Sequence, residues 1–466
     1  MARHRRSRAG GFTYAKKPLV ILALVTFVDQ VDTSILRGVQ ELIKEDFKLS
    51  DFALGALSFA FVFVNALVTI PAGWVADRYT RTRVIGWVLL SWSALSTMAA
   101  LALNYVQLFA ARALLGFGQA VDDPSSTSLL ADYYPARARG RVFSVQQVLF
   151  FVGLGAGVAL GGFVGGALGW RWAFLLVGVP GSLTAIAVFR LREPLRGEAD
   201  GVTEDSRDLP DALPPRELAV RAWAELRSEL KMILSIRTMR YILIGVSVML
   251  FTVMAIGQWL VPYYERTFDM STGHAAGVVG LVLGVGGIIG TLWGGRAADR
   301  VYGSSPAGRI NLVSSAITAC AAAFIISFAV STLRLTLPLQ FLGLVAASAC
   351  APALRAALMD VAPMQSRGMS TSAFALISTI FGTALAPPLV GLLSDLTGSL
   401  VTAFYIVMPP VIVGALVLRR ARFTIADDAQ VIIQSILDRS QALETTEGTG
   451  DAPAPTPADE DEATQL

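Results

Sequence analysis

The chain has 466 residues, of which 54% are hydrophobic and 16% charged, and the charged residues cluster between long apolar runs. A soluble domain of this length does not need so apolar a composition, which makes the lipid bilayer its expected solvent. Residues 441–466 contribute −7 to the net charge of +3, so the rest of the chain carries +10. This basic excess suits an anionic membrane surface rather than nucleic acid.

Twelve apolar windows, each of about the 20 residues that a spanning helix needs, follow one another along the chain. We therefore predict an all-α membrane protein with twelve transmembrane helices. Pro352, Pro387 and Pro388 fall inside two of the windows and are expected to kink the tenth and eleventh helices. The windows begin near Leu19, Phe52, Val84, Tyr105, Val142, Trp172, Tyr241, Gly273, Ile310, Leu337, Met369 and Leu400.

Lys and Arg gather in alternate connections, namely residues 3–17, 78–83, 137–141, 190–240, 296–309, 367 and 419–422. Connections rich in Lys and Arg stay on the cytoplasmic side of a membrane. We therefore expect a multi-pass protein of the plasma (inner) membrane with both termini in the cytoplasm.

Residues 132–140 read DYYPARARG and residues 360–368 read DVAPMQSRG, so that Asp, Pro, Arg and Gly recur at an offset of 228 residues (360 − 132). A repeat at about half the chain length indicates two tandem, pseudo-symmetric six-helix bundles, an organisation typical of transporters. The expected parts are a basic terminus (1–17), a first bundle (18–190), a cytoplasmic linker (191–238), a second bundle (239–418) and a tail (419–466) that is acidic and disordered at its end. Within the linker, residues 216–233 fit either an amphipathic helix along the membrane interface or a solvated helix.

Two further connections share a motif. Residues 73–83 read GWVADRYTRTR and residues 295–300 read GRAADR, each with Gly followed four and five residues later by Asp and Arg. A Gly lets two helices approach closely, and an Asp beside Arg residues and a helix terminus can hold one conformation. We predict a cytoplasmic gate formed by Gly73, Asp77, Arg78, Arg81, Arg83, Asp132, Arg139, Asp299, Arg300, Asp360 and Arg367.

These motifs resemble those of the major facilitator superfamily. The loop signature is matched by Gly73, Asp77, Arg78, Arg81 and Arg83, the fourth-helix motif by Arg112, Gly116 and Gly118, and the fifth-helix glycines by Gly153, Gly157, Gly161 and Gly162. Antiporters of the superfamily usually carry Pro where this chain has Val158. The resemblance covers residues 18–418 and implies the major facilitator fold and a secondary transporter that works by alternating access.

A narrower resemblance is to spinster-type lipid transporters of that superfamily. It rests on residues 27–30 (FVDQ), residues 49–51 (LSD) with Gly55, and residues 112–119, although the family usually has Arg in place of Gln30 and Glu in place of Gln119. It implies a lysolipid or sphingoid cargo. A multidrug or small-metabolite carrier of the same superfamily is the alternative, and a membrane-embedded lipid enzyme is a remote one.

Charged residues inside membrane spans are costly and usually face a cavity or a partner. Asp29 lies near the middle of the first span and Asp32 one turn further, while Arg112, Gln119 and Asp123 share a stripe of the fourth span. Because these helices run in opposite directions, Gln119 should lie at the depth of Asp29, and Arg112 at that of Asp32 or Arg37. The candidates for proton coupling are Asp29, Asp32, Asp122 and Asp123; alternatively, Asp29 and Asp32 stay ionised in fixed pairs with Arg37 or Arg112.

The candidates for the cargo cavity are Arg37, Arg112, Gln119, Gln146, Gln147, Gln258 and Trp259, with Arg355 as a weaker one. The sequence has no metal-ligand spacing and no phosphate-binding loop, so we expect no cofactor, no metal and no enzymatic activity. The expected partners are the lipid bilayer, a small-molecule or lipid cargo and protons, with no nucleic acid, and we expect the protein to be a monomer.

Overall fold

The structure is a computed structural model that describes residues 15–201, 230–302, 307–330, 332–361 and 367–428, with the single positions 224, 227, 228 and 430. The side chains of residues 70–71, 73–78, 302 and 359–372 lie outside this description. Regular structure within the described ranges is almost entirely helical, as predicted.

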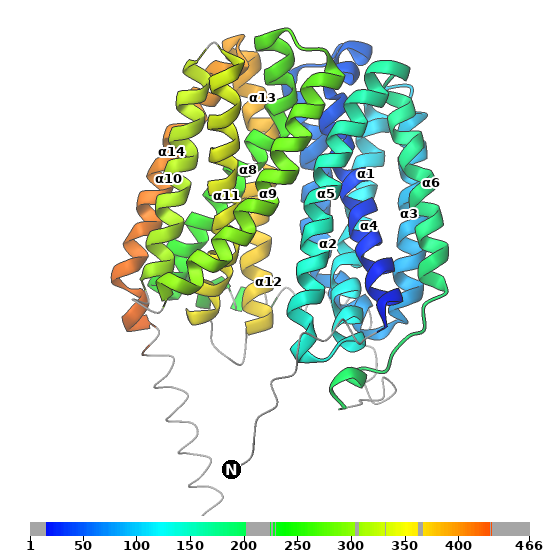
Figure 1. Ribbon diagram of the computed structural model, residues 1–466, viewed down its shortest axis with the longest axis vertical. Coiled ribbons are helices and arrows are strands. Elements are labelled where there is room, and N and C mark those ends of the chain that lie inside the picture. The colour runs from blue at the N-terminus through cyan, green and yellow to red at the C-terminus, as the bar shows by residue number, and fades with distance from the viewer. Residues whose placement is uncertain are drawn as a thin grey trace, which may run out of the picture.

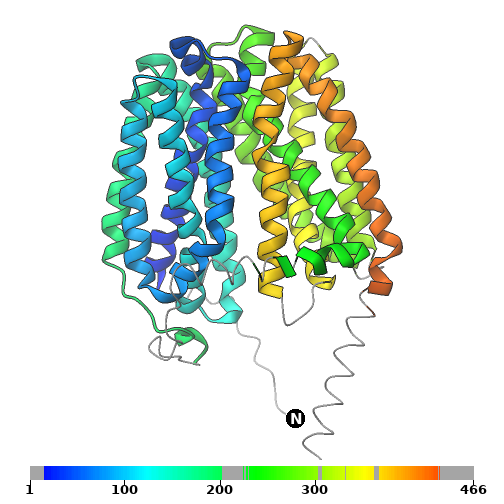
Figure 2. The same cartoon turned by 180° about the vertical axis from the view of Figure 1, so that it is seen from behind.

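The helices fall into two groups that lie side by side (Figures 1 and 2). The first group comprises α1 (Lys16–Phe47), α2 (Asp51–Arg78), α3 (Arg81–Ala100), α4 (Tyr105–Tyr133), α5 (Ala136–Leu168) and α6 (Trp170–Phe189), followed by the short η1 (Glu198–Asp200). The second comprises α8 (Arg237–Phe268), α9 (Thr272–Tyr302), α10 (Gly308–Ala329), α11 (Leu333–Val361), α12 (Arg367–Ser378), η3 (Thr379–Ala384), α13 (Ala386–Thr397), α14 (Leu400–Arg419) and η4 (Arg420–Phe423). We call these groups the first and second halves.

Eleven helical segments of the described residues are long and apolar enough to cross a membrane. The remaining predicted span is α4, whose 29 residues rise about 43 Å, more than the ~30 Å of a hydrocarbon core. It is less apolar than the others because Arg112, Asp122 and Asp123 lie along its length. With α4 included, all twelve predicted spans are helical.

The eleventh span is divided into α12, η3 and α13. The π-helical turn of η3 ends just before Pro387 and Pro388. Proline has no N–H to donate, and its ring would clash with the carbonyl group four residues earlier, so the preceding turn widens. By contrast, α11 runs as one helix through Pro338 and Pro352.

The two halves meet at one end and diverge at the other (Figure 1). We call the end at which α1 begins and α14 ends the terminal face, and the other end the opposite face. Towards the opposite face α5 packs on α9 and α2 packs on α13. A Cβ atom on Gly155 of α5 would lie 2.4 Å from the carbonyl oxygen of Gly280 on α9, so this contact requires glycine.

Most of the predicted linker helix lies outside the described residues, as do the terminus before residue 15 and the acidic tail. The described end of the linker, residues 230–235, is helical. Ile233 is buried there against the core of the second half, and Leu230 packs beside it. This end of the linker therefore belongs to the packed structure.

Candidate functional site

A cavity of about 670 Å³ lies between the halves. Its walls come from α1, α2, α4 and α5 of the first half and from Arg355 on α11 of the second half. Of its seventeen lining residues, only Ala120, Pro124, Phe143 and Phe150 are apolar. The cavity is therefore a polar chamber inside an apolar protein, and such chambers in membrane proteins mark functional sites.

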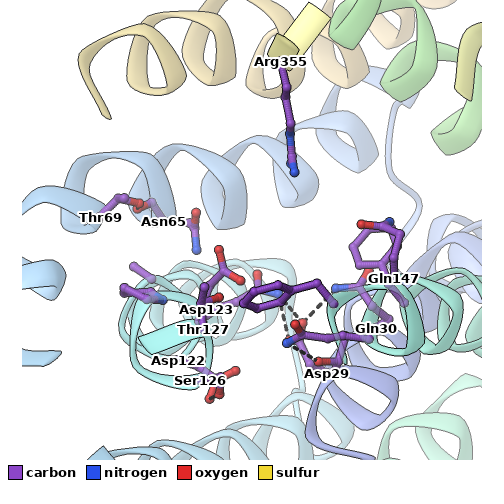
Figure 3. A pocket seen from close by; sticks show the side chains of 17 residues that line it. Asp29, Gln30, Asn65, Thr69, Asp122, Asp123, Ser126, Thr127, Gln147 and Arg355 are labelled. Atoms are coloured by element: carbon purple, nitrogen blue, oxygen red, sulfur yellow. Dashed lines mark hydrogen bonds between the residues drawn. The ribbon is translucent and has the colours of Figure 1, made fainter. Parts of the chain in front are cut away.

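Asp29 on α1 lies in this cavity and is held by neutral amides (Figure 3). Gln119 Nε2 lies 2.7 Å from each carboxyl oxygen of Asp29, and Gln30 Nε2 donates to Oδ2 at 2.8 Å. Asp29 is only 9% exposed, and it has no ion pair with a described residue. An amide can turn to present its oxygen instead, so this arrangement can accommodate either an ionised or a protonated carboxyl group.

Asp122 and Asp123 on α4 line the same cavity. Asp122 is 6% exposed and accepts a hydrogen bond of 3.1 Å from Ser126 Oγ. Asp123 faces the cavity, and the Arg355 side chain reaches towards it from the second half (Figure 3). Asp123 and Arg355 interact electrostatically across the cavity, and no hydrogen bond or ion pair joins either of them to a described residue.

Three charged members of the predicted site lie outside this cavity. Asp32 is buried and accepts a hydrogen bond of 2.5 Å from Ser96 Oγ. Arg112 is 2% exposed and stacks over the Phe174 ring at 4.9 Å, while Arg37 contacts the Met254 sulfur at 3.5 Å. Arg37 and Arg112 line a separate pocket nearer the opposite face instead of this cavity, so their place in the cargo site stays a prediction.

The predicted glutamines of α5 and α8 have different surroundings. Gln146 and Gln147 line the cavity, and Gln146 Nε2 donates to Thr26 Oγ1 at 3.1 Å. Gln258 instead exchanges two hydrogen bonds of 2.7 Å with Gln40 of the first half. Trp259 is fully buried and donates from Nε1 to the Pro387 carbonyl oxygen at 3.0 Å. Gln258 and Trp259 do not line this cavity, since that part of α8 faces α1 and α13, and their role in the cargo site stays a prediction.

The opposite face carries an ionic cluster that the sequence analysis did not identify. Arg266 of α8 donates to both oxygens of Asp51 at 2.7 Å and to Glu41 Oε1 at 2.6 Å. The carboxylate of Asp395 on α13 accepts hydrogen bonds from the backbone N–H groups of Asp51 and Phe52 at 2.9 and 2.8 Å. A residue of the second half thereby caps the start of α2. We call this cluster the opposite-face latch. The partners of Arg266 lie 215 and 225 residues away, so no local pattern reveals them.

At the terminal face, the hydrogen bonds that Arg81, Asp132 and Arg139 of the predicted gate form with described residues all lie within the first half. Arg81 bonds Asp132 at the end of α4, Ser128 at 2.8 Å and Glu193 at 2.8 Å. Asp299 and Arg300 are exposed at the end of α9 and form no ion pair with a described residue. The surroundings of Gly73 and the side chains of Asp77, Arg78, Asp360 and Arg367 lie outside the description.

Arg139, another predicted gate residue, caps the end of α4. Its Nη2 donates to the Ala131 carbonyl oxygen at 2.8 Å, and its guanidinium also pairs with Asp200. The hydrogen bonds from the Ala136 backbone and from Arg139 lower the pKa of Asp200 below its usual value. This pairing ties η1 to the α4–α5 turn within the first half.

Replacing Arg81 by glutamine should destabilise the protein by about 2–4 kcal/mol, because it leaves Asp132 and Glu193 without their cation. The buried guanidinium is 2% exposed, whereas Arg83 two residues later is exposed and pairs with no described residue. Arg83→Gln should therefore change stability by no more than about 0.5 kcal/mol. Unfolding of both variants in detergent checks this, and equal stabilities would contradict a structural role for Arg81.

The family model of the Major Facilitator Superfamily matches residues 22–381. An MFS-type efflux pump of Mycolicibacterium smegmatis is 27% identical over 380 residues, which are 80% of this chain and 83% of that protein. Protein spinster of Drosophila melanogaster is 24% identical over 189 residues, or 39% of this chain and 30% of that protein.

A solved structure has the same fold. It is the crystal structure of a bacterial homologue of the human lysosomal transporter Spinster, in an inward-facing and unoccupied conformation. The TM-score is 0.70 at 20% sequence identity, and the match covers 91% of this chain and 99% of that one. At this identity the likeness concerns the fold alone.

Proposed function

Since this chain belongs to the major facilitator superfamily and is a membrane transporter, we propose that it couples the movement of a cargo to that of protons by alternating access. In such a cycle two halves rock about a central site, which opens to one side of the membrane at a time. The Gly155–Gly280 contact and the opposite-face latch close one end, and the halves diverge at the other. With the basic connections in the cytoplasm, this conformation faces inward, in the plasma (inner) membrane.

The geometry of Asp29 carries the proton proposal. A group that carries a proton through the cycle must exist in both charge states, and a permanent cation beside it would hold it ionised. Asp29 has the amides of Gln119 and Gln30 as neighbours instead. Its place in the cavity wall gives protons access in this conformation. Asp122 and Asp123 are the second choice for this role.

The cavity lining bears on the cargo. Among the described lining residues, three carboxyl groups and one guanidinium give a negative balance, and thirteen of the seventeen are polar. This favours a small polar molecule with a positively charged group, which falls within the metabolite and multidrug alternative.

An amphiphile is the second candidate cargo, supported by the spinster relative and by the spinster-like fold. Its polar headgroup would occupy the cavity beside Asp122 and Asp123. The tail would lie against Phe143 and Phe150 or leave through the gap between the halves, because four of the described lining residues are apolar. We also propose that the protein acts as a monomer, since the described walls of the cavity already combine both halves of the chain.

A thermal-shift screen of the purified protein tests this proposal. The panel contains small organic cations, aromatic acids, sphingoid bases and lysolipids, each at pH 6 and pH 8. A ligand at one hundred times its Kd stabilises its target by about 2.7 kcal/mol. We expect organic cations to stabilise the protein more at pH 8 than at pH 6, because protons compete for the same carboxylates. Stabilisation by aromatic acids alone would contradict the cargo class, whereas stabilisation by sphingoid bases and lysolipids alone would select the amphiphile.

A further inference from the structure

A second, smaller pocket of about 30 Å³ lies between the central cavity and the opposite face. Helices α1, α2 and α4 of the first half form most of it, and Met254 and Gln258 of α8 close it from the second half. Arg37 and Arg112 both line this pocket. Its volume is sufficient for one occupant of about the size of a water molecule.

Arg112 is a buried cation with unused hydrogen-bonding capacity. It is 2% exposed, and its Nε and Nη2 atoms have no hydrogen-bond partner among the described residues. Each guanidinium nitrogen carries N–H groups that are costly to bury unpaired. The Phe174 ring at 4.9 Å offers a weak attraction but accepts no hydrogen bond in the plane of the guanidinium.

The neighbours of the pocket leave its positive charge in excess. The polar contact of Arg37 is the weakly accepting sulfur of Met254 at 3.5 Å, and the Gln258 amide is already bonded to Gln40. Asp32 is the carboxylate that attracts the Arg112 guanidinium electrostatically. It lies outside the pocket lining and accepts a hydrogen bond from Ser96. Two guanidinium groups and one carboxylate amount to an excess of one positive charge in apolar surroundings.

We propose that this pocket binds one small monovalent anion, of the size of chloride, between Arg37 and Arg112. An anion would accept hydrogen bonds from the Nε and Nη2 groups of Arg112. It would also balance the excess positive charge, since a buried charge is stable only when it is paired. The site spans α8 of the second half and three helices of the first. Binding therefore stabilises the conformation in which the opposite face is closed, whichever cargo the central cavity carries.

The test measures the melting temperature of the purified protein in nanodiscs as chloride replaces gluconate at constant ionic strength. We expect a saturable rise of about 2–3 °C with chloride and none with gluconate, which is too large for the pocket. A parallel series with formate asks whether a small carboxylate occupies the same site. A rise with chloride or with formate that depends on both arginines supports the proposal.

The variants are Arg37→Gln and Arg112→Gln, and Arg83→Gln is the matched control because its guanidinium is exposed near the start of α3, outside both cavities. We expect the rise to disappear in the first two variants and to persist in the control. Arg37 is only partly buried and has one weak polar contact, so Arg37→Gln provides the test even if Arg112→Gln does not fold. Equal melting temperatures in all salts, or an equal rise in Arg37→Gln and the unmodified protein, would overturn the proposal.

Discussion

Asp29→Asn should lower the rate of proton-driven transport by about tenfold or more while cargo exchange without a gradient continues. Asparagine has the size of aspartate, and its side-chain oxygen can still accept the Gln119 amide, but it cannot take up a proton. The measurement is uptake into proteoliposomes with and without an imposed pH gradient, using the cargo that the thermal-shift screen identifies.

The control for this experiment is Asp46→Asn. Asp46 lies at the opposite face, outside the central cavity, and its Oδ2 is 2.7 Å from Nη1 of Arg171. This variant should keep its dependence on the gradient. Gradient-dependent uptake by Asp29→Asn at the unmodified rate would remove Asp29 from proton coupling, and Asp122→Asn would then be the next variant to measure.

Gly155→Val should slow transport strongly by preventing closure of the opposite face. Even the Cβ atom would lie 2.4 Å from the Gly280 carbonyl oxygen, a backbone atom that cannot turn away as a side chain can. The two halves would have to separate at this end, so the outward-facing conformation should predominate. Transport should fall by about tenfold or more, since a shift of ~1.4 kcal/mol already changes a population ratio tenfold.

A cysteine placed at Asn65 in the cavity wall reports the conformation through its reaction with a membrane-impermeant thiol reagent. The native Cys320 and Cys350 are buried and should not react. We expect labelling from the terminal face in the otherwise unmodified protein and from the opposite face in Gly155→Val. Gly166→Ala on the same helix is the control, because a Cβ atom there meets nothing closer than 3.7 Å. Unchanged labelling and transport in Gly155→Val would contradict this role of the glycine contact.

The sequence predicted the spans well because a spanning helix requires a long apolar run. It also brought Asp29 and Gln119 to one depth, since antiparallel helices of known direction fix relative height, and the structure joins these two side chains. Most of the site residues that the sequence could predict therefore lie on helices of the first half.

The sequence could not determine which way the side chains of α8 face. A helix that is apolar on most sides gives no rotational signal, so Gln258 and Trp259 could be placed on α8 but not oriented. Pairings between the halves were also out of reach, because Arg266 and Asp51 are 215 residues apart. The sequence also could not show that Arg112 is buried away from the central cavity, because its position depends on how the helices pack together.

Distances between spin labels at the two faces test alternating access most directly. One pair of labels replaces Leu103 and Leu396, which are exposed near the opposite face on different halves. The other replaces Arg141 near the start of α5 and Arg300 near the end of α9, at the terminal face. When pH or cargo changes, we expect the first distance to lengthen as the second shortens. Two distances that stay constant, or that change in the same direction, would contradict a transporter whose halves rock about the central cavity.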